Sequence, residues 1–216
     1  MKENLPLKHR ISVERCNLKW AQQLVTQHHY LHKPVDRRAM PFAYSINLDG
    51  KAIGTIIMAI PHWNRQKNLF TTQDKWVSGE KHLPTAWQVL CISRLWIDPS
   101  VQNQQSNGHA SNIGSCAIAK MLRRVQRDWI EHHPPVFPEL PYHLKLILAH
   151  ADLGVGHEGI VYQAANFTRW GMTQKTRARE TSRGSVSGSQ KILWIYRLSE
   201  PSWKWSPKTL QLELAV

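Results

Sequence analysis

The chain has 216 residues, of which 42% are hydrophobic and ten are tryptophan, so it can bury a sizeable core and is expected to be globular. Its 28 lysines and arginines against 15 acidic residues give a net charge of +13, which favours an anionic partner such as nucleic acid, a nucleotide cofactor or an acidic surface. A basic surface that binds nothing is the alternative.

The three cysteines have no C-x-x-C spacing, which argues against a disulfide framework and a zinc ribbon. The first 30 residues contain no apolar signal region, and no run approaches the roughly 18 apolar residues of a membrane span. We therefore expect a protein of the cytoplasm.

The first half of the chain predicts a helix followed by a hairpin. Residues 17–31 open with a capping asparagine and have apolar residues at helical spacing. Residues 42–49 and 51–60 are β-rich runs separated at Asp49-Gly50, a strong signal for a tight hairpin turn. Residues 61–86 have no sustained period and are expected to form a long loop.

The middle of the chain predicts a buried strand and then a long helix. Residues 87–98 form a central-strand candidate, and a polar loop follows at residues 101–108. Residues 110–132 have the clearest helical pattern in the chain. Its apolar stripe comprises Ile113, Ala117, Ile118, Met121, Leu122, Val125 and Trp129. Its opposite face is expected to carry Lys120, Arg123, Arg124 and Arg127.

The last third predicts a strand, a short helix and two more strands. The strand is expected at 144–151, the helix at 156–170, and the final strands near 172–178 and 190–198. The tail, 199–216, has no assignment. Because neither an internal repeat nor a linker is visible, we expect one α/β domain over residues 1–216, with its core at about 10–198.

The order of these elements resembles that of GNAT acyltransferases. The Q/R-x-x-G-x-G/A loop of that family has a literal match in Gln105, Gly108 and Ala110, and a second register ends at Gly114. The resemblance implies a twisted mixed sheet of six to seven strands flanked by helices. It also implies an acetyl-CoA or related acyl-CoA donor, whose pyrophosphate meets backbone amides at a helix N-terminus. The residues implied for the donor are Ile97, Gln105, Gly108, Ala110, Ser111, Gly114 and Ser115. An ordinary turn rich in Asn and Gly is the alternative.

A more particular resemblance is carried by SRLWIDP at 93–99, HAD followed by GHEG at 150–159, and YQAANF at 162–167, with HHYLH at 28–32. Together they look like the Mom family of phage DNA-modification proteins, which are themselves GNAT-like. This resemblance implies a carbamoylmethylated product at N6 of adenine in double-stranded DNA. A phage or prophage gene expressed in a bacterial cytoplasm, protecting DNA from restriction, would follow.

The resemblance implies a catalytic set of Arg94, Asp152 and Tyr162. Asp152 would end a strand where the acyl group meets its acceptor, and would accept a proton from the amine or hold it in place. Tyr162 would protonate the departing thiolate. Two structural alternatives stay open: Asp152 as a cap of the following turn, and Arg94 as an interior partner of Asp152. Tyr162 as a packing residue is a third.

An adenine in duplex DNA has to leave the stack before its amine is accessible, so a basic groove with aromatic side chains is expected. The candidates for phosphate contacts are Arg123, Arg124, Arg127, Arg169, Lys175, Arg177, Arg179 and Arg183. His62, Trp63 and Trp76 are candidates for contact with the flipped base or the gap it leaves; packing of a lid is their alternative.

The histidines permit a metal site, to which no residue is committed. The candidates are His28, His32, His150 and His157. The leading hypothesis is a Mom-like DNA-modifying transferase. A generic GNAT N-acetyltransferase acting on a protein, tRNA or small amine is the main alternative, and a non-catalytic DNA-binding module is a third.

Overall fold

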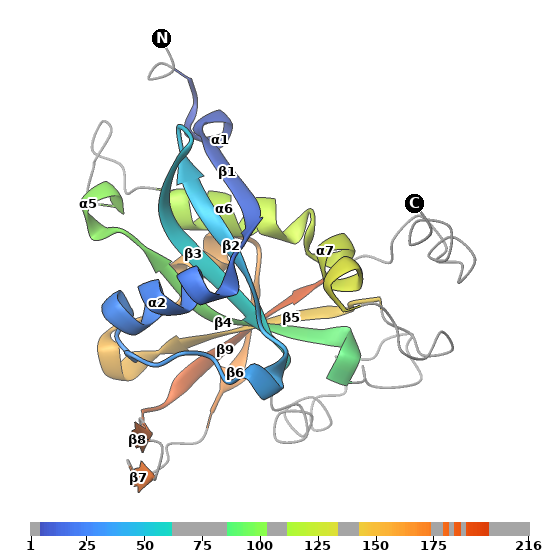
Figure 1. The fold of residues 1–216 in the computed structure, drawn as a ribbon. Helices are drawn as coiled ribbons and strands as arrows, with labels where there is room; N and C mark the ends of the chain where they lie inside the picture. The colour runs from blue at the N-terminus through green and yellow to red at the C-terminus, as the bar shows by residue number, and fades with distance from the viewer. Residues whose placement is uncertain are drawn as a thin grey trace.

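The fold is a seven-stranded mixed sheet with helices on both faces (Figure 1). The structure is a computed structural model, and it describes residues 5–61, 86–102, 112–133, 143–173, 179–181, 184–186 and 189–198. The strand order is β1-β2-β3-β4-β5-β9-β6. This sheet confirms the predicted α/β class and the predicted mixed sheet of six to seven strands flanked by helices.

The N-terminal half of the sheet is an antiparallel meander. Its strands are β1 (Ile11–Cys16), β2 (Phe42–Leu48), β3 (Lys51–Ala59) and β4 (Val89–Ile97). Asp49 and Gly50 have φ values of 52° and 87°, so both residues of the predicted hairpin turn have the positive φ that such a two-residue turn requires. Strand β1 was not predicted, because the alternation of Ile11 and Val13 with polar residues is too short to stand out.

Helix α2 (Leu18–His28) packs on one face of this meander. It begins as predicted, since the side chain of Asn17 accepts hydrogen bonds from the backbone N–H groups of Lys19 and Trp20. It ends three residues before the predicted bound. The side chains of Ala21 and Val25 are buried against the strands.

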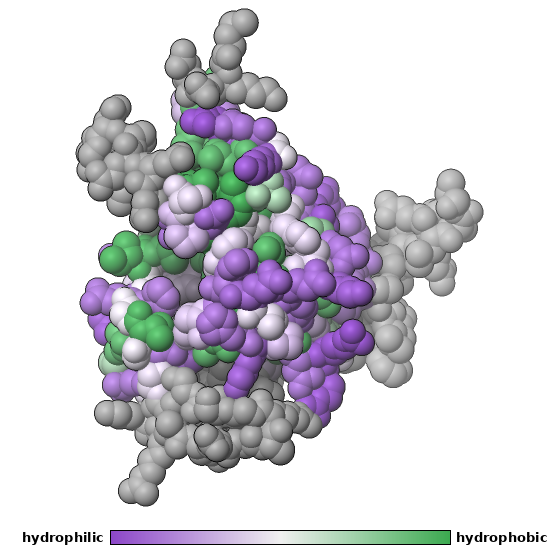
Figure 2. All heavy atoms as spheres, turned by 60° about the vertical axis from the view of Figure 1, so that its left-hand side comes forward, coloured by the Kyte–Doolittle hydropathy of each residue, from purple (hydrophilic) through white to green (hydrophobic). Residues whose placement is uncertain are grey.

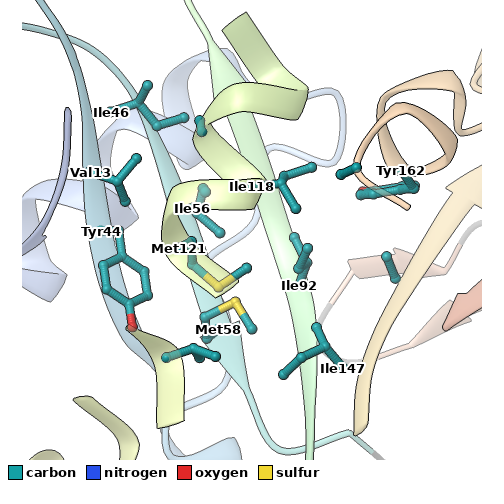
Figure 3. Packing of buried hydrophobic residues seen from close by; sticks show 14 of the residues in the cluster. Val13, Tyr44, Ile46, Ile56, Met58, Ile92, Ile118, Met121, Ile147 and Tyr162 are labelled. Atoms are coloured by element: carbon teal, nitrogen blue, oxygen red, sulfur yellow. The ribbon is translucent and has the colours of Figure 1, made fainter. Parts of the chain in front are cut away.

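The predicted helix at 110–132 is two helices, α6 (Ile113–Leu122) and α7 (Val125–His132). They cover the other face of the sheet, and most of the predicted apolar stripe is buried there. Figure 3 shows Ile118 and Met121 directed from α6 toward the side chains of Ile56, Met58 and Ile92 on the strands. A continuous helix was wrong because the chain leaves helical geometry at Arg124, where φ is −120°.

The C-terminal half adds β5 (Leu146–Asp152), α8 (Ile160–Ala164), β6 (Thr168–Met172) and β9 (Lys191–Arg197). The predicted helix at 156–170 was too long, because Asn166 adopts a positive φ of 65° and an antiparallel strand follows. The strand predicted near 172–178 overlaps β6 only at Met172, and residues 174–178 lie outside the described residues. The strand predicted at 190–198 is confirmed as β9.

The remaining described elements are short. They are α1 (Leu7–Arg10), α5 (Pro99–Gln102), β7 (Arg179–Thr181), β8 (Gly184–Val186) and the 3-10 turns η1 (Arg37–Ala39), η2 (Ala86–Gln88) and η3 (Leu153–Val155). Most of the loop predicted at 61–86 and the tail at 199–216 lie outside the described residues. In the part of the chain described, no helix is long and apolar enough to cross a membrane.

Candidate active site

The two parallel strands β4 and β5 pair over only part of their length. Their ladder ends where Ile92 lies opposite Ala149. Strand β4 nevertheless continues to Ile97 and β5 to Asp152. Beyond this point the backbones part within the sheet, and the groups between them are available to a ligand.

A cavity of about 870 Å³ lies at this parting. Its described wall consists of Ile92–Ile97, Pro99 and Gln102, His28–Tyr30, Gly114, His150 and Ala151, and Gly156–Tyr162. This volume is within the range of small-molecule and cofactor sites. Segments from α2, β4, α6, β5 and α8 therefore meet at one place, although they are distant in sequence.

The cavity has contributions from both faces of the sheet. Tyr162 packs with the core under α6, where Figure 3 shows it near Ile118. Trp96 packs with the cluster under α2 instead. Side chains alternate along a strand, so Asp152 points to the face opposite that of Ala151, which belongs to the α6 core. Tyr162 thus lines the cavity from one face, whereas Asp152 follows the lining residue Ala151 and points to the other face.

Asp152 is almost completely buried, with 1% of its surface exposed. Its Oδ1 accepts hydrogen bonds from Ser189 Oγ and from the backbone N–H of Gly154 at 3.0 Å. The ammonium of Lys191 lies 3.0 Å from Oδ2. Burial alone would raise the pKa of Asp152, but the hydrogen bonds from Ser189 and Lys191 and the lysine's charge outweigh it and lower the pKa. The carboxylate is therefore ionised at neutral pH.

The bond to Gly154 makes Asp152 the cap of turn η3, so one predicted structural alternative is realised. This bond occupies only Oδ1: Oδ2 is in ionic contact with Lys191, and the phenol of Tyr30 also interacts with the Asp152 carboxylate. Asp152 combines a structural bond with a charged oxygen beside the cavity.

A β-bulge directs Arg94 into the site. The ladder with β3 leaves Ser93 without an opposite residue between Ile92 and Arg94, and such a bulge re-aims the adjacent side chain. The guanidinium of Arg94 donates to the carbonyl oxygens of Lys33 at 3.4 Å and Ser93 at 2.6 Å. The alternative that Arg94 pairs with Asp152 was wrong: Asp152 pairs with Lys191.

Tyr162 lies in α8 with 8% of its surface exposed. Its ring packs against Phe167 with the centroids 5.7 Å apart, so the packing role left open in the sequence is also present. Burial raises the pKa of Tyr162, followed by the influence of Cys91 and Tyr30. The phenol is consequently protonated and able to donate a proton at the cavity wall.

The HHYLH segment brings aromatic rings to the cavity face that holds Arg94. The ring of His28 stacks on Trp96 at a centroid distance of 4.9 Å, and Tyr30 contacts His157 edge-on at 5.6 Å. The backbone N–H of Leu31 donates to His29 Nδ1. Burial, followed by the charge of Arg94, lowers the pKa of His29 to about 4, so this imidazole is neutral at neutral pH.

Sequence reasoning named His28 and His157 only as candidate metal ligands and gave the other rings no role beyond the family resemblance. It missed Lys191 and Ser189 completely. The partnership of Lys191 with Asp152 follows from the β5–β9 register, where the two residues are directly opposite. Nothing local in the sequence signals that register.

With this geometry established, the comparisons with known proteins identify the family. The model of the Mom protein family matches residues 10–193. The chain belongs to the Mom protein family. Membership confirms the resemblance carried by the SRLWIDP, HAD and YQAANF motifs. Comparison with curated proteins found no match.

Among solved structures, the Mom family chain is similar to acetyltransferases. A RimL ribosomal L7/L12 alpha-N-protein acetyltransferase shares 13% identity at a TM-score of 0.49, covering 89% of this chain and 96% of its own. An aminoglycoside acetyltransferase, AAC(6')-Ib, in complex with coenzyme A shares 12% at 0.48, covering 87% and 94%. A GNAT family acetyltransferase from Elizabethkingia anophelis with acetyl-CoA bound shares 12% at 0.43, covering 88% and 99%. Identities and TM-scores this low carry no argument about activity or substrate.

The structure describes three of the seven residues that were predicted to hold a donor. Gly114 and Ile97 line the cavity of this Mom family chain. A Cβ added at Gly114 would lie 2.6 Å from Val161 Cγ2, so glycine permits the close approach of α6 to α8. Ser115 Oγ donates to the carbonyl of Asn112. The other donor candidates, Gln105, Gly108, Ala110 and Ser111, lie outside the described residues.

The residues predicted to contact DNA phosphates differ in their exposure to solvent. Arg123, Arg127 and Arg169 are exposed, whereas Arg124 is directed inward. Arg124 Nε lies 2.5 Å from Oδ2 of the fully buried Asp128, and its NH1 donates to the carbonyl of Val13. Assigning Arg124 to the exposed face was therefore wrong, because its guanidinium neutralises a buried carboxylate. Arg179 lies in β7, and His62, Trp63, Trp76, Lys175, Arg177 and Arg183 lie outside the described residues.

The histidine candidates do not assemble into a recognisable metal centre in the described residues, where no group of three or more His, Cys, Asp or Glu side chains is suitably placed. His150 Nδ1 lies 3.7 Å from Cys91 Sγ. Burial, followed by the charge of Lys191, lowers the pKa of His150 to about 4.

Proposed function

We propose that this chain is a DNA-modifying transferase that converts adenine N6 to a carbamoylmethylated base with an acyl-CoA-like donor. One observation carries the proposal: the cavity at the parting of β4 and β5 is lined by the protonated Tyr162 and by Tyr30, and Tyr30 interacts with the ionised Asp152 on the opposite face. Transfer of an acyl group from a thioester to N6 breaks the carbon–sulfur bond and forms an amide bond, so the amine loses a proton and the thiolate gains one. A carbamoylmethyl group is attached to N6 through its CH2 carbon, so forming it requires a further step after this transfer.

The α6 face suits the donor. Its cavity wall includes Gly114 in the first turn of α6 and Ile97 at the end of β4, and a helix N-terminus favours phosphate groups. When bound, an acyl-CoA-like donor supplies an activated carbon with a thiol leaving group. Tyr162 then donates its phenolic proton to the departing sulfur.

The α2 face suits a nucleobase. The stacked pair of His28 and Trp96, with Tyr30 and His157 nearby, offers aromatic surfaces of the kind that hold an extruded base. Asp152 is the proton acceptor or hydrogen-bond partner for the exocyclic amine. An ionised carboxylate is needed here because the amine's lone pair is delocalised into the ring and the amine is a poor nucleophile. Arg94 supplies a positive charge beside the acceptor.

The cellular setting follows from the same proposal. The partner is double-stranded DNA, which agrees with the net charge of +13. We place the reaction in a bacterial cytoplasm, on phage or prophage DNA that the modification protects from restriction.

The test is mass spectrometry of nucleosides from plasmid DNA recovered from cells that express the chain. We expect a deoxyadenosine adduct with the mass of a carbamoylmethyl group, absent with Asp152→Asn. The matched control is Asp49→Asn, which lies in the remote hairpin turn and keeps a residue that tolerates positive φ. An unmodified profile with folded wild-type protein would contradict the proposal and direct the search to protein and tRNA amines.

A further inference from the structure

Exposed apolar side chains are concentrated beside the active site. Among the described residues, five large hydrophobic side chains are exposed, and three of them follow Asp152 within one short segment. The exposed fractions are 37% for Leu153, 45% for Val155 and 71% for Ile160. On the face in Figure 2, hydrophobic residues (green) are set among mostly hydrophilic ones (purple). Because these side chains lie close together in the chain, they are candidates for a binding surface.

Leu153 and Val155 lie in a turn with several internal bonds. Asp152 Oδ1 accepts from Gly154 N, and the Asp152 carbonyl accepts from His157 N at 3.0 Å. Gly156 N donates to the carbonyl of Leu153, and Gly156 has the positive φ of 73° that closes the turn. The two apolar side chains are thus presented on a preorganised backbone.

This turn is attached directly to the proposed acceptor site. Leu153 follows Asp152, and consecutive Cα atoms are about 3.8 Å apart. The chain then continues into the cavity wall at Gly156–Tyr162. An adenine whose amine reaches Asp152 therefore brings the neighbouring DNA within reach of Leu153 and Val155.

The charge and chemistry around Leu153 and Val155 favour DNA as the partner that these two side chains contact. Extruding a base leaves an apolar gap between two stacked neighbours, and proteins commonly insert aliphatic side chains into such steps. The chain carries +13, and between Leu153 and Met172 the sequence contains a single acidic residue, Glu158. The donor is expected on the α6 face, where Gly114 and Tyr162 lie, whereas Asp152 points to the opposite face.

We propose that Leu153 and Val155 form a wedge that enters the base stack of duplex DNA and occupies the gap left by the extruded adenine. The inference rests on the proposed function for its target base. It predicts a specific dependence: the wedge is required when the adenine is stacked in a duplex and is dispensable when the DNA is single-stranded.

The test compares the wild type with Leu153→Ser/Val155→Ser on duplex and single-stranded oligonucleotides of the same sequence. Because extrusion costs a few kcal/mol, we expect the double variant to lose about tenfold or more in modification rate on the duplex and less than about twofold on the single strand. Leu5→Ser, an exposed leucine before α1 at the other end of the sheet order, is the matched control and retains both rates. Equal losses on both substrates, or none, would overturn the wedge.

A second readout separates this inference from the proposed function. A duplex carrying 2-aminopurine at the target position becomes more fluorescent when the base leaves the stack. We expect that increase with wild-type protein and its loss with the double variant at saturating protein, with melting temperatures unchanged. If the wild type unstacks the base but adds no group, the proposed chemistry fails and the wedge stands. If the wild type leaves the base stacked, the wedge is wrong.

Discussion

Asp152 and Lys191 are directly opposite on β5 and β9, and the lysine Nζ lies 3.0 Å from the carboxylate Oδ2. Opposite charges at facing positions of an antiparallel ladder attract. Here the carboxylate is buried and would otherwise tend to be protonated. Lys191 and Ser189 hold Asp152 ionised next to the cavity, which is the state that accepts a proton from an amine.

Replacing Lys191 with methionine should change the pH dependence of modification. Removing the cation raises the pKa of Asp152, so the carboxylate is protonated, and activity is lost, at a higher pH than in the wild type. Because the lysine's charge is one of the causes that lower this pKa, the acid limb of the rate profile should move to higher pH. Lys191→Arg should keep the wild-type profile. An unchanged acid limb in the methionine variant would show that Lys191 does not tune Asp152.

Tyr162→Phe should reduce the modification rate by about a hundredfold, because general acid catalysis contributes at least this much in many enzymes. The fold should tolerate the change, since the ring and its contact with Phe167 remain. Tyr196→Phe is the matched control, because Tyr196 packs on the same Phe167 from β9 at 5.3 Å. The measurement is the modification rate per folded molecule of each variant. Equal rates for Tyr162→Phe and Tyr196→Phe would assign Tyr162 to packing alone.

Gly114→Ala should destabilise the protein. Its Cβ would lie 2.6 Å from Val161 Cγ2, and such overpacking costs about 1–3 kcal/mol. Chemical denaturation should show the loss, and adding Val161→Ala should restore part of it. Gly171→Ala is the control, because a Cβ there would meet no atom within 4 Å. Similar losses for both substitutions would contradict the role of the α6–α8 contact.

Arg124→Met and Arg123→Met should have different effects although the residues are adjacent. Losing Arg124 removes the closest cation from the buried Asp128 and leaves it the Tyr44 phenol and a 3.9 Å contact with Arg127 Nε, at a cost of about 3 kcal/mol. Arg123 is exposed, and its removal should leave stability unchanged but weaken DNA binding at every sequence. Denaturation and salt-dependent binding assays distinguish the two roles. A stable Arg124→Met variant would show that Asp128 is compensated in another way.

Mild acid should destabilise the fold. His29, His133 and His150 have pKa values lowered from 6.5 to about 4, in each case mainly by burial. Because the unfolded chain binds these protons more readily, their contribution to stability is complete above pH 6.5 and is lost as the pH falls toward 4. The melting temperature should decrease between pH 7.5 and 5. His29→Gln should flatten that decrease, and an identical slope would exclude His29 from it.

The sequence by itself determined the features that depend on local pattern. The asparagine-capped helix, the Asp49-Gly50 hairpin and the apolar stripe from Ile113 to Trp129 follow from residue spacing and backbone preference. The family motifs around Arg94, Asp152 and Tyr162 were readable for the same reason. The single domain over residues 1–216 and the role of each site residue stay predictions.

Only the tertiary structure decided which distant side chains meet. The pairing of Asp152 with Lys191 depends on the β5–β9 register, and the placement of Arg94 depends on a bulge opposite β3. The inward turn of Arg124 was hidden because a helical pattern does not reveal a break within it. Contacts between residues far apart in the chain are set by strand register and by the packing of helices on the sheet, and neither is encoded in the spacing of neighbouring residues.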